Sequence, residues 1–296
     1  MATSLGPFLK ELTALLEEGR VDSPRLSAEV LLAHALGVER LEMLRELILD
    51  SGREICQEKA EVALGLVQRR YRGEPVAHLV GSREFYGRDF FVNKHTLIPR
   101  PETELLIEKS LSYVQKVLDE RGVCFFADLG TGSGCLAVTL ALEATGAKGA
   151  AVDLSREALK VARQNASFYK TGNVGFALAD FTRPCFLAGS LDLIVSNPPY
   201  VSELEYSQCD REVRLFEPRS ALVPAVVTGQ ASGLEHFQAI VEHAASYLKP
   251  GGALFLEMGS TQADDVSAMC GRDKWSGVQV WADLAGLPRT LSAYRV

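Results

Sequence analysis

From Val123 to the C-terminus, short apolar runs alternate with amphipathic stretches, and this alternation constrains the fold more than any other feature of the sequence. Strands are predicted near residues 123–128, 149–153, 174–178, 191–196, 252–257, 277–281 and 289–295, with helices near 133–145, 155–169, 230–248 and 260–271. This order predicts a parallel sheet with helices on both faces. The last two strands have no clear helix between them, so we expect an antiparallel terminal hairpin. The predicted fold class is α/β, a doubly wound, Rossmann-like sheet.

The first third of the chain has a different pattern. Apolar residues recur at helical spacing over 7–16 and 54–71, and Ser23-Pro24 is a typical start for a helix that Gly37 would end. Residues 78–92 are typical of a β-hairpin with Gly87 near its turn. We therefore predict a helical domain over 1–75, a β-hairpin linker over 76–100 and a second domain over 101–296.

The tetrapeptide Asn197-Pro198-Pro199-Tyr200 follows the apolar run 191–196, which is typical of a buried parallel strand. The two prolines end the strand and remove two backbone donors. An Asn carboxamide, a proline carbonyl and an aromatic ring are thus expected at the carboxyl end of a strand, where open α/β sheets bind ligands. This corner could accept both hydrogens of a planar –NH2 group. The alternative is a plain Pro-Pro turn.

A glycine-rich turn, Asp128 to Gly134, lies between a predicted strand and a predicted helix. Such a turn lets a ligand approach the backbone closely, although alone it could serve a dinucleotide, another nucleotide or nothing. Asp153 ends the next strand, about 20 residues on, which is the spacing at which a carboxylate meets ribose hydroxyls. Asp180 and Phe181 could hydrogen-bond to an adenine and cover its ring. Alternatively, they could be a surface acid beside a core phenylalanine.

Composition narrows the class of protein. The chain has 296 residues, 47% of them hydrophobic, and a net charge of −7, which argues mildly against a nucleic-acid substrate. The six cysteines form no close pair, which favours reduced thiols over disulfides or a zinc site. No apolar run is long enough to span a membrane and no targeting signal is evident, so we expect a cytoplasmic protein. His236 and His243 share a helix face but lack further metal ligands, so a solvated or packing role is expected.

Together these motifs resemble the class I S-adenosylmethionine-dependent methyltransferases. More closely, the chain resembles the bacterial glutamine methyltransferases that act on peptide chain release factors. The resemblance covers the whole chain and is carried by the segments 84–87, 97–104, 128–134, Asp153, 197–200 and 213–218. The tetrapeptide alone is shared with other amide and base methyltransferases. Its combination with the Pro-Arg-Pro-Glu-Thr loop at 99–103 and Phe216-Glu217-Pro218 is much more specific.

The resemblance implies S-adenosylmethionine as methyl donor and the GGQ glutamine of a release factor as acceptor. The implied donor-binding residues are Gly130, Thr131, Gly132, Ser133, Gly134, Asp153, Asp180, Phe181 and Asn197. The implied substrate-binding residues are Asn197, Pro198, Pro199, Tyr200 and Arg100, with Asn197, Pro198 and Tyr200 as the catalytic group. No metal is implied. Two departures from the family pattern are Phe181, a position often occupied by Trp, and the extra Leu215, which leaves the placement of Arg214 open.

Other activities share these motifs. A sister enzyme methylates glutamine in a ribosomal protein, and the catalytic motifs barely separate the two. An adenine methyltransferase would flip a base into the same pocket and stack it on Tyr200, but the acidic composition opposes that function. A non-catalytic binding protein would not need Asn197 together with the glycine-rich turn. The oligomeric state is not encoded in any recognisable pattern.

Overall fold

The computed structural model describes residues 3–226 and 229–296, and the chain divides into two compact units. One unit comprises Met1–Ser82 with Arg211–Phe216, and the other comprises Arg83–Asp210 with Glu217–Val296. The segment 211–216 thus groups with the helical unit although it is distant in sequence. The domain boundaries at residues 75 and 100 remain a prediction.

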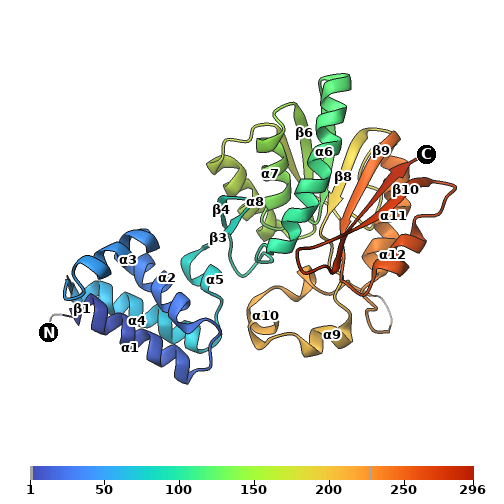
Figure 1. Ribbon diagram of the computed structural model, residues 1–296. Coiled ribbons are helices and arrows are strands. Elements are labelled where there is room, and N and C mark those ends of the chain that lie inside the picture. Colours follow the sequence, from blue (N-terminus) through green and yellow to red (C-terminus); the bar gives the residue numbers. More distant parts are fainter. Residues whose placement is uncertain (1–2, 227–228) are drawn as a thin grey trace. The chain divides into compact units, whose positions relative to one another are not determined.

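The first unit is built from helices around one apolar core (Figure 1). Its elements are β1 (Thr3–Ser4), α1 (Leu5–Glu18), α2 (Pro24–Leu36), α3 (Arg40–Leu49), β2 (Glu54–Ile55), α4 (Gln57–Tyr71), α5 (Val76–Val80) and α10 (Arg211–Phe216). Leu9, Leu12 and Leu31 are fully buried in this core. Arg70 of α4 forms an ion pair with Glu212 of α10, and this pair ties the distant segment to the unit. The predicted helical bundle is confirmed.

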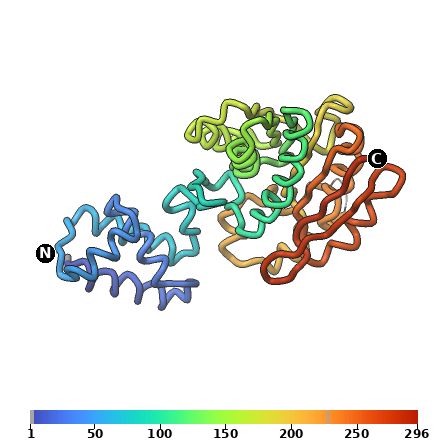
Figure 2. The backbone as a smooth tube through the Cα atoms, turned by 45° about the horizontal axis from the view of Figure 1, so that its top comes forward, coloured from blue at the N-terminus to red at the C-terminus, as the bar shows by residue number. Residues whose placement is uncertain are grey.

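The second unit contains a seven-stranded sheet. Its strands are β5 (Cys124–Leu129), β6 (Ala147–Asp153), β7 (Val174–Leu178), β8 (Leu191–Ser196), β9 (Leu248–Glu257), β10 (Trp275–Ala282) and β11 (Pro288–Arg295). They lie in the order β10-β11-β9-β8-β5-β6-β7. The strands from β5 to β9 are parallel, whereas β11 is antiparallel to both β9 and β10. Figure 2 shows this terminal hairpin in red. The predicted α/β fold and its antiparallel hairpin are confirmed.

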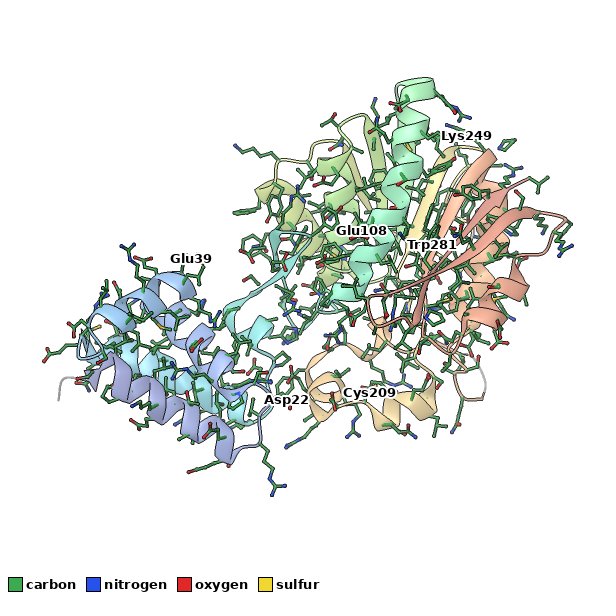
Figure 3. All side chains as sticks on the ribbon, in the orientation of Figure 1. Asp22, Glu39, Glu108, Cys209, Lys249 and Trp281 are labelled. Atoms are coloured by element: carbon green, nitrogen blue, oxygen red, sulfur yellow. The ribbon has the colours of Figure 1, made fainter. Side chains whose placement is uncertain are left out.

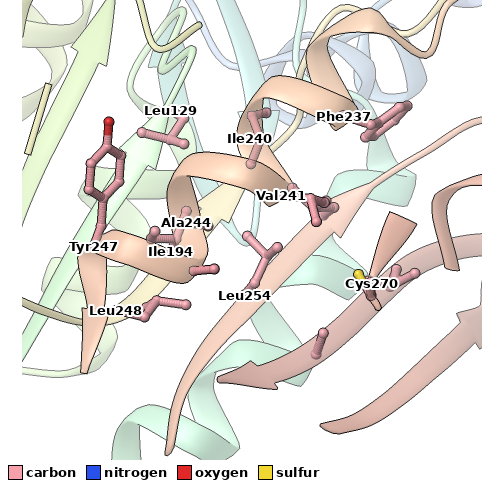
Figure 4. Packing of buried hydrophobic residues seen from close by; sticks show 14 of the residues in the cluster. Leu129, Ile194, Phe237, Ile240, Val241, Ala244, Tyr247, Leu248, Leu254 and Cys270 are labelled. Atoms are coloured by element: carbon pink, nitrogen blue, oxygen red, sulfur yellow. The ribbon is translucent and has the colours of Figure 1, made fainter. Parts of the chain in front are cut away.

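Helices cover both faces of the sheet because alternate strand residues point to opposite sides. Phe126, Val195 and Phe255 pack with α6 (Glu104–Arg121), α7 (Cys135–Glu143) and α8 (Arg156–Phe168). Leu129 and Ile194 face the other way, toward α11 (Glu235–Tyr247) and α12 (Ala263–Met269), as Figure 4 shows for α11. Both faces are therefore apolar, which explains why these strands read as continuous apolar runs rather than alternating ones.

The remaining elements are short. They are β3 (Ser82–Phe85), β4 (Arg88–Phe91), η1 (Pro101–Thr103), α9 (Glu203–Gln208) and η2 (Arg219–Ala221). The strands β3 and β4 form the predicted hairpin, with Tyr86 and Gly87 at positive φ in its turn. Buried Asn165 of α8 holds the hairpin, because its amide accepts from the Phe91 N–H at 2.8 Å and donates to the Phe91 carbonyl at 3.0 Å.

One local prediction was wrong, and one helix was missed. The hairpin was expected to begin at His78, but residues 76–80 form α5, which ends at Gly81 with φ +75° and buries Leu79 in the helical core. The helix α3 was not predicted, because Met43 is its one buried residue and Leu41, Ile48 and Leu49 are exposed. A helix with so narrow an apolar stripe gives little periodic signal.

The amino ends of the parallel strands are joined by a buried carboxylate. Asp192 of β8 is 1% exposed, and it accepts from Lys249 Nζ at 2.8 Å, from Arg121 at 2.8 Å and from the Phe125 N–H at 2.9 Å. Lys249 is labelled at this end of the sheet in Figure 3. These donors compensate the cost of burying the carboxylate. It fixes the end of the sheet opposite to the carboxyl ends of the strands.

Tight packing between β5 and β6 gives a stability prediction. A Cβ on Gly149 would lie 2.2 Å from the Cζ of buried Phe126. We expect Gly149→Ala to lower the free energy of unfolding by about 1–3 kcal/mol, the usual effect of overpacking a core. Gly175→Ala on β7 is the matched control, because its Cβ would be 3.9 Å from the nearest atom. Denaturant unfolding of both variants is the measurement, and equal midpoints would contradict the prediction.

Candidate active site

A cavity of about 310 Å³ lies at the carboxyl ends of the parallel strands of the second unit. Its walls come from the loop before η1, from the loops after β5, β6, β7 and β8, and from the start of α11. The lining residues include Thr103, Gly130, Thr131, Gly132, Ser133, Asp153, Asp180, Phe181, Asn197, Pro199 and His236. This volume is at the lower end of the range for small-molecule sites.

The glycine-rich turn and Asp153 hold each other in place. The Gly130 and Thr131 N–H groups both donate to the Val152 carbonyl at 2.9 Å. The Gly132 N–H donates to Asp153 Oδ2 at 2.8 Å, and the Ser155 N–H donates to Asp153 Oδ1 at 2.8 Å. Burial is the main cause that raises the pKa of the Asp153 carboxyl. Each carboxylate oxygen can still accept a further hydrogen bond from a ligand hydroxyl.

The packing around position 134 requires a glycine there. Gly134 has φ +82°, and a Cβ there would lie 3.0 Å from the Cβ of Ala162 on α8. Its small size lets the start of α7 approach α8, while Asn165 of α8 donates to the Ser133 carbonyl at 2.8 Å. Contacts with α8 therefore help to fix the conformation of the turn.

A buried carboxyl lies under the same turn. Asp128, the last acidic residue of β5, is fully buried and accepts from the Thr131 hydroxyl at 2.6 Å. Burial raises its pKa to about 7. The turn therefore rests on a group that can change charge near neutral pH.

An aromatic wall closes another side of the cavity. Phe181 is 8% exposed and meets the His236 ring edge-to-face at 5.1 Å between centroids. Asp180 accepts from the backbone N–H of Thr182 at 3.0 Å and from its hydroxyl at 2.5 Å, and the hydroxyl is the main cause that lowers the Asp180 pKa. Burial lowers the His236 pKa, which favours a neutral ring. His236, expected to be solvated or packed, thus lines the cavity and packs on Phe181.

The tetrapeptide is divided between the cavity and the protein interior. Asn197 and Pro199 line the cavity, whereas Pro198 and Tyr200 are not among its lining residues. The Asn197 amide nitrogen donates to the Thr103 hydroxyl at 3.2 Å. Tyr200 stacks on Phe237 at 6.5 Å between centroids and donates to Glu257 Oε1 at 3.2 Å. Its predicted contact with a substrate amide therefore stays a prediction.

Arg100 does not line the cavity. Its guanidinium donates to Glu217 Oε1 at 2.5 Å, and the Ile98 N–H donates to Glu217 Oε2 at 3.0 Å. Glu217 is 5% exposed. Phe216 and Arg214 group with the first unit, in α10. The glutamate of the Phe-Glu-Pro motif thus holds the Pro-Arg-Pro loop, a role that sequence reasoning did not assign to it.

Two site residues were missed from the sequence. Thr103 lines the cavity and contacts Asn197, although in the sequence analysis its loop is only a family motif before a helix and Thr103 has no assigned role. Glu257 is the last residue of β9 and is 1% exposed. Burial raises its pKa to about 7, while the hydroxyls of Thr103 and Tyr200 oppose that rise. An acid that ends a buried strand was the signal used for Asp153, and it would have found Glu257 too.

Comparison with known proteins agrees with these features. Residues 8–81 match the family model described as "PrmC N-terminal domain", and residues 109–285 match one described as "Methyltransferase domain". A solved methyltransferase from Pyrococcus furiosus is similar at 17% identity and a TM-score of 0.48, over 77% of this chain and 96% of that chain.

Curated relatives match nearly the whole chain. The release factor glutamine methyltransferase of Nitratidesulfovibrio vulgaris is 44% identical over 99% of this chain and 95% of its own. The protein of that name from Chlorobaculum tepidum is 40% identical over 98% and 96%, and the one from Bacillus subtilis is 38% identical over 94% and 93%. Identity at this level over this length shows common descent. The chain belongs to the release factor glutamine methyltransferase family.

Proposed function

We propose that this chain transfers a methyl group from S-adenosylmethionine to the side-chain amide nitrogen of the GGQ glutamine in a peptide chain release factor. The observation that carries the proposal is the place of Asn197. Its carboxamide lines the cavity beside the glycine-rich turn, and its nitrogen end is already bound to Thr103. Its oxygen end is then the group left to accept an N–H from a substrate.

The residues of the cavity fit the donor. Gly130 and Gly132 of the turn line the cavity without side chains, so a ligand can approach their backbone. Asp153 can accept from two hydroxyls, and the half-exposed Asp180 beside buried Phe181 offers an acceptor and an apolar wall for a base. When bound there, S-adenosylmethionine supplies an electrophilic methyl group. The donor-binding roles of these residues remain proposals.

The chain's own contribution to transfer is mostly positioning. A glutamine amide nitrogen is a weak nucleophile because its lone pair is delocalised, so orientation matters more than a strong base. The Asn197 oxygen and the Pro198 carbonyl would accept the two amide hydrogens and favour positive charge developing on that nitrogen. No ionisable base is needed while the N–C bond forms, because the cationic amide that results is a strong acid and loses its extra proton to water. A glutamate would place its anion against these acceptors and would be rejected.

The other activities left open by the sequence have less support. The relatives named above are release factor enzymes, which favours that substrate over a ribosomal protein. The acidic net charge of −7 opposes a nucleic-acid substrate. Among the described residues no helix has the length and apolarity to cross a membrane. We place the enzyme in the cytoplasm, where a release factor would meet it. A methylation assay with release factor, ribosomal protein and DNA in parallel tests the substrate directly.

Loss of the Asn197 carboxamide gives the sharpest test of the site. We expect Asn197→Ala to lower turnover by about 10²–10³-fold, as for the loss of one preorganised hydrogen-bonding group. Asn173→Ala is the control, because Asn173 donates to the carbonyls of Ala141 and Ala147 and should affect stability but not turnover. Turnover is measured at saturating donor. Near-normal turnover in the Asn197 variant would remove it from this role.

Asp153 gives a test of donor binding. We expect Asp153→Ala to weaken S-adenosylmethionine binding more than tenfold, because bonds to a charged carboxylate contribute about 1.5–3 kcal/mol each. Asp119→Ala on α6 is the control, since Asp119 is exposed and does not line the cavity. Titration calorimetry measures both affinities. An unchanged affinity in the Asp153 variant would mean that the carboxylate does not contact the donor.

We further propose that the helical unit recognises the release factor. The cavity is lined by residues of the second unit, whereas α3 of the first exposes Leu41 to 76%, Ile48 to 85% and Leu49 to 76%. Leu41 and Ile48 are seven residues apart and share one helix face. Exposed apolar side chains gathered on one face are typical of a protein-binding surface.

This role predicts a difference between protein and peptide substrates. We expect the double variant Leu41→Ser, Ile48→Ser to lower kcat/KM for intact release factor at least tenfold, while a short glutamine peptide keeps its kcat/KM. Leu187→Ser, which changes an equally exposed leucine of the second unit, is the control. The measurement is the ratio of kcat/KM, protein over peptide. If that ratio is the same in all three enzymes, α3 does not contact the substrate.

A further inference from the structure

Glu257 is a buried acid that the proposed transfer step does not use. It ends β9, next to the strand whose end carries Asn197. Its Oε1 accepts from the Tyr200 hydroxyl at 3.2 Å. Its Oε2 is buried and lacks a well-formed hydrogen bond within residues 3–226 and 229–296. The carboxylate therefore has capacity for another donor, and the Thr103 hydroxyl lies near enough to lower its pKa.

Thr103 connects this acid to the site. Its hydroxyl accepts from the Asn197 amide nitrogen at 3.2 Å, and it is 2% exposed, so water does not compete for it. A hydroxyl carries one hydrogen. Because its oxygen already accepts from Asn197, that hydrogen is free to point at Glu257. A hydrogen bond from Thr103 to the open Oε2 would complete a chain in which each group donates to the next, from Asn197 through Thr103 to Glu257.

The direction of these hydrogen bonds determines which end of the Asn197 carboxamide faces the cavity. A carboxamide can turn end over end with almost no change in shape, so its hydrogen-bond partners determine which end points where. An ionised carboxylate accepts only, which forces Thr103 to donate to it and to accept from Asn197. The Asn197 oxygen then faces the cavity. We propose that Glu257, acting through Thr103, is a positioning residue that fixes the Asn197 carboxamide with its oxygen toward the substrate.

This inference rests on the proposed function, because an oxygen facing the cavity matters only for a substrate that donates, such as an amide –NH2. With a neutral amide or carboxylic acid at position 257, the side chain there can donate a hydrogen bond. Thr103 can then accept from it and donate to Asn197, and the carboxamide is free to turn. The –NH2 group of Asn197 would face the –NH2 group of glutamine, and the acceptor would be lost.

The first test uses two isosteric variants. We expect Glu257→Gln, which brings a donor to position 257, and Thr103→Val, which removes the relay, each to lower kcat at least tenfold at saturating donor. Donor affinity should change less than threefold, because neither change touches the turn or Asp153. Thr103→Ser keeps the hydroxyl and should restore kcat to within threefold of the parent.

Two matched controls separate positioning from general damage. Asp192→Asn neutralises another buried acid, at the opposite end of β8. Thr139→Val removes another buried hydroxyl, one without a hydrogen-bond partner in the described chain. Both should keep kcat, whatever they do to stability. If either loses as much as Glu257→Gln, the effect is structural and the proposal fails.

A change in the preference for glutamine over glutamate is a result that structural damage alone would not produce. Binding of a glutamine peptide and of the same peptide with glutamate is compared by calorimetry with the donor product bound. The parent should prefer glutamine. In both Glu257→Gln and Thr103→Val the preference should shift at least fivefold toward glutamate, since a turned carboxamide offers a donor to an anion. Thr103→Val keeps the charge of Glu257, so a shift there is not a simple charge effect.

A pH profile gives an independent readout. The charged or titratable groups around Glu257 are Tyr200, Arg289 of β11, Glu102 of η1 and Cys135 of α7. Burial raises the pKa values of Tyr200 and Cys135, the latter to about 12, so neither ionises near neutrality. With the Glu257 pKa at about 7, the parent's kcat should rise as pH increases through 7.

The variants test whether Glu257 causes the rise of kcat with pH. It should vanish in Glu257→Gln and persist in Asp192→Asn. Saturating donor removes the effect of Asp128 on donor binding, since Asp128 also titrates near 7. A rise that persists in Glu257→Gln, together with an unchanged kcat, would overturn the inference. A parent enzyme that methylates no glutamine substrate would instead refute the proposed function, before any variant is compared.

Discussion

The register of the parallel strands is the constraint on which the site depends. Leu129 of β5 pairs with Val152 of β6 and with Ser196 of β8, and Ser196 pairs with Leu256 of β9. The residues that follow these four are Gly130, Asp153, Asn197 and Glu257, and they lie at the same level, at the carboxyl ends of their strands. A slip of one residue would reverse the faces of a strand, and the apolar layers on both sides forbid it. Packing in the core therefore aligns the polar groups.

The loop before η1, which carries Ile98 and Arg100, is held in place by a single buried carboxylate. Glu217 accepts from the Ile98 N–H and from the Arg100 guanidinium, and it is nearly inaccessible to water. Because a buried charge is costly without partners, the loop and Glu217 each need the other. This loop leads directly into Thr103, so the clamp also places the hydroxyl that contacts Asn197. Prolines on both sides of Arg100 reduce the freedom that this clamp has to overcome.

The sequence predicted the second unit well and parts of the site poorly, for reasons visible in single residues. The strands of the sheet are buried on both faces, so their apolar runs were long enough to find. The helix α3 has one buried residue and left no periodic signal. The contact of the Tyr200 ring with the substrate stays a prediction, but its stacking on Phe237 and its hydrogen bond to Glu257 were not predicted. These partners depend on tertiary contacts, which a linear motif does not contain.

The proposed roles of Asn197 and Glu257 would let a site built of neutral acceptors discriminate charge. Asn197 presents an oxygen, and the carboxylate of Glu257 lies behind it through Thr103. A glutamine amide brings donors and no charge, so it satisfies the oxygen and leaves the buried acid undisturbed. A glutamate would bring a second negative charge toward Glu257, with no donor turned to meet it. In a dry interior this repulsion is stronger than in water, so in its proposed role the buried acid would both orient the acceptor and oppose the wrong substrate.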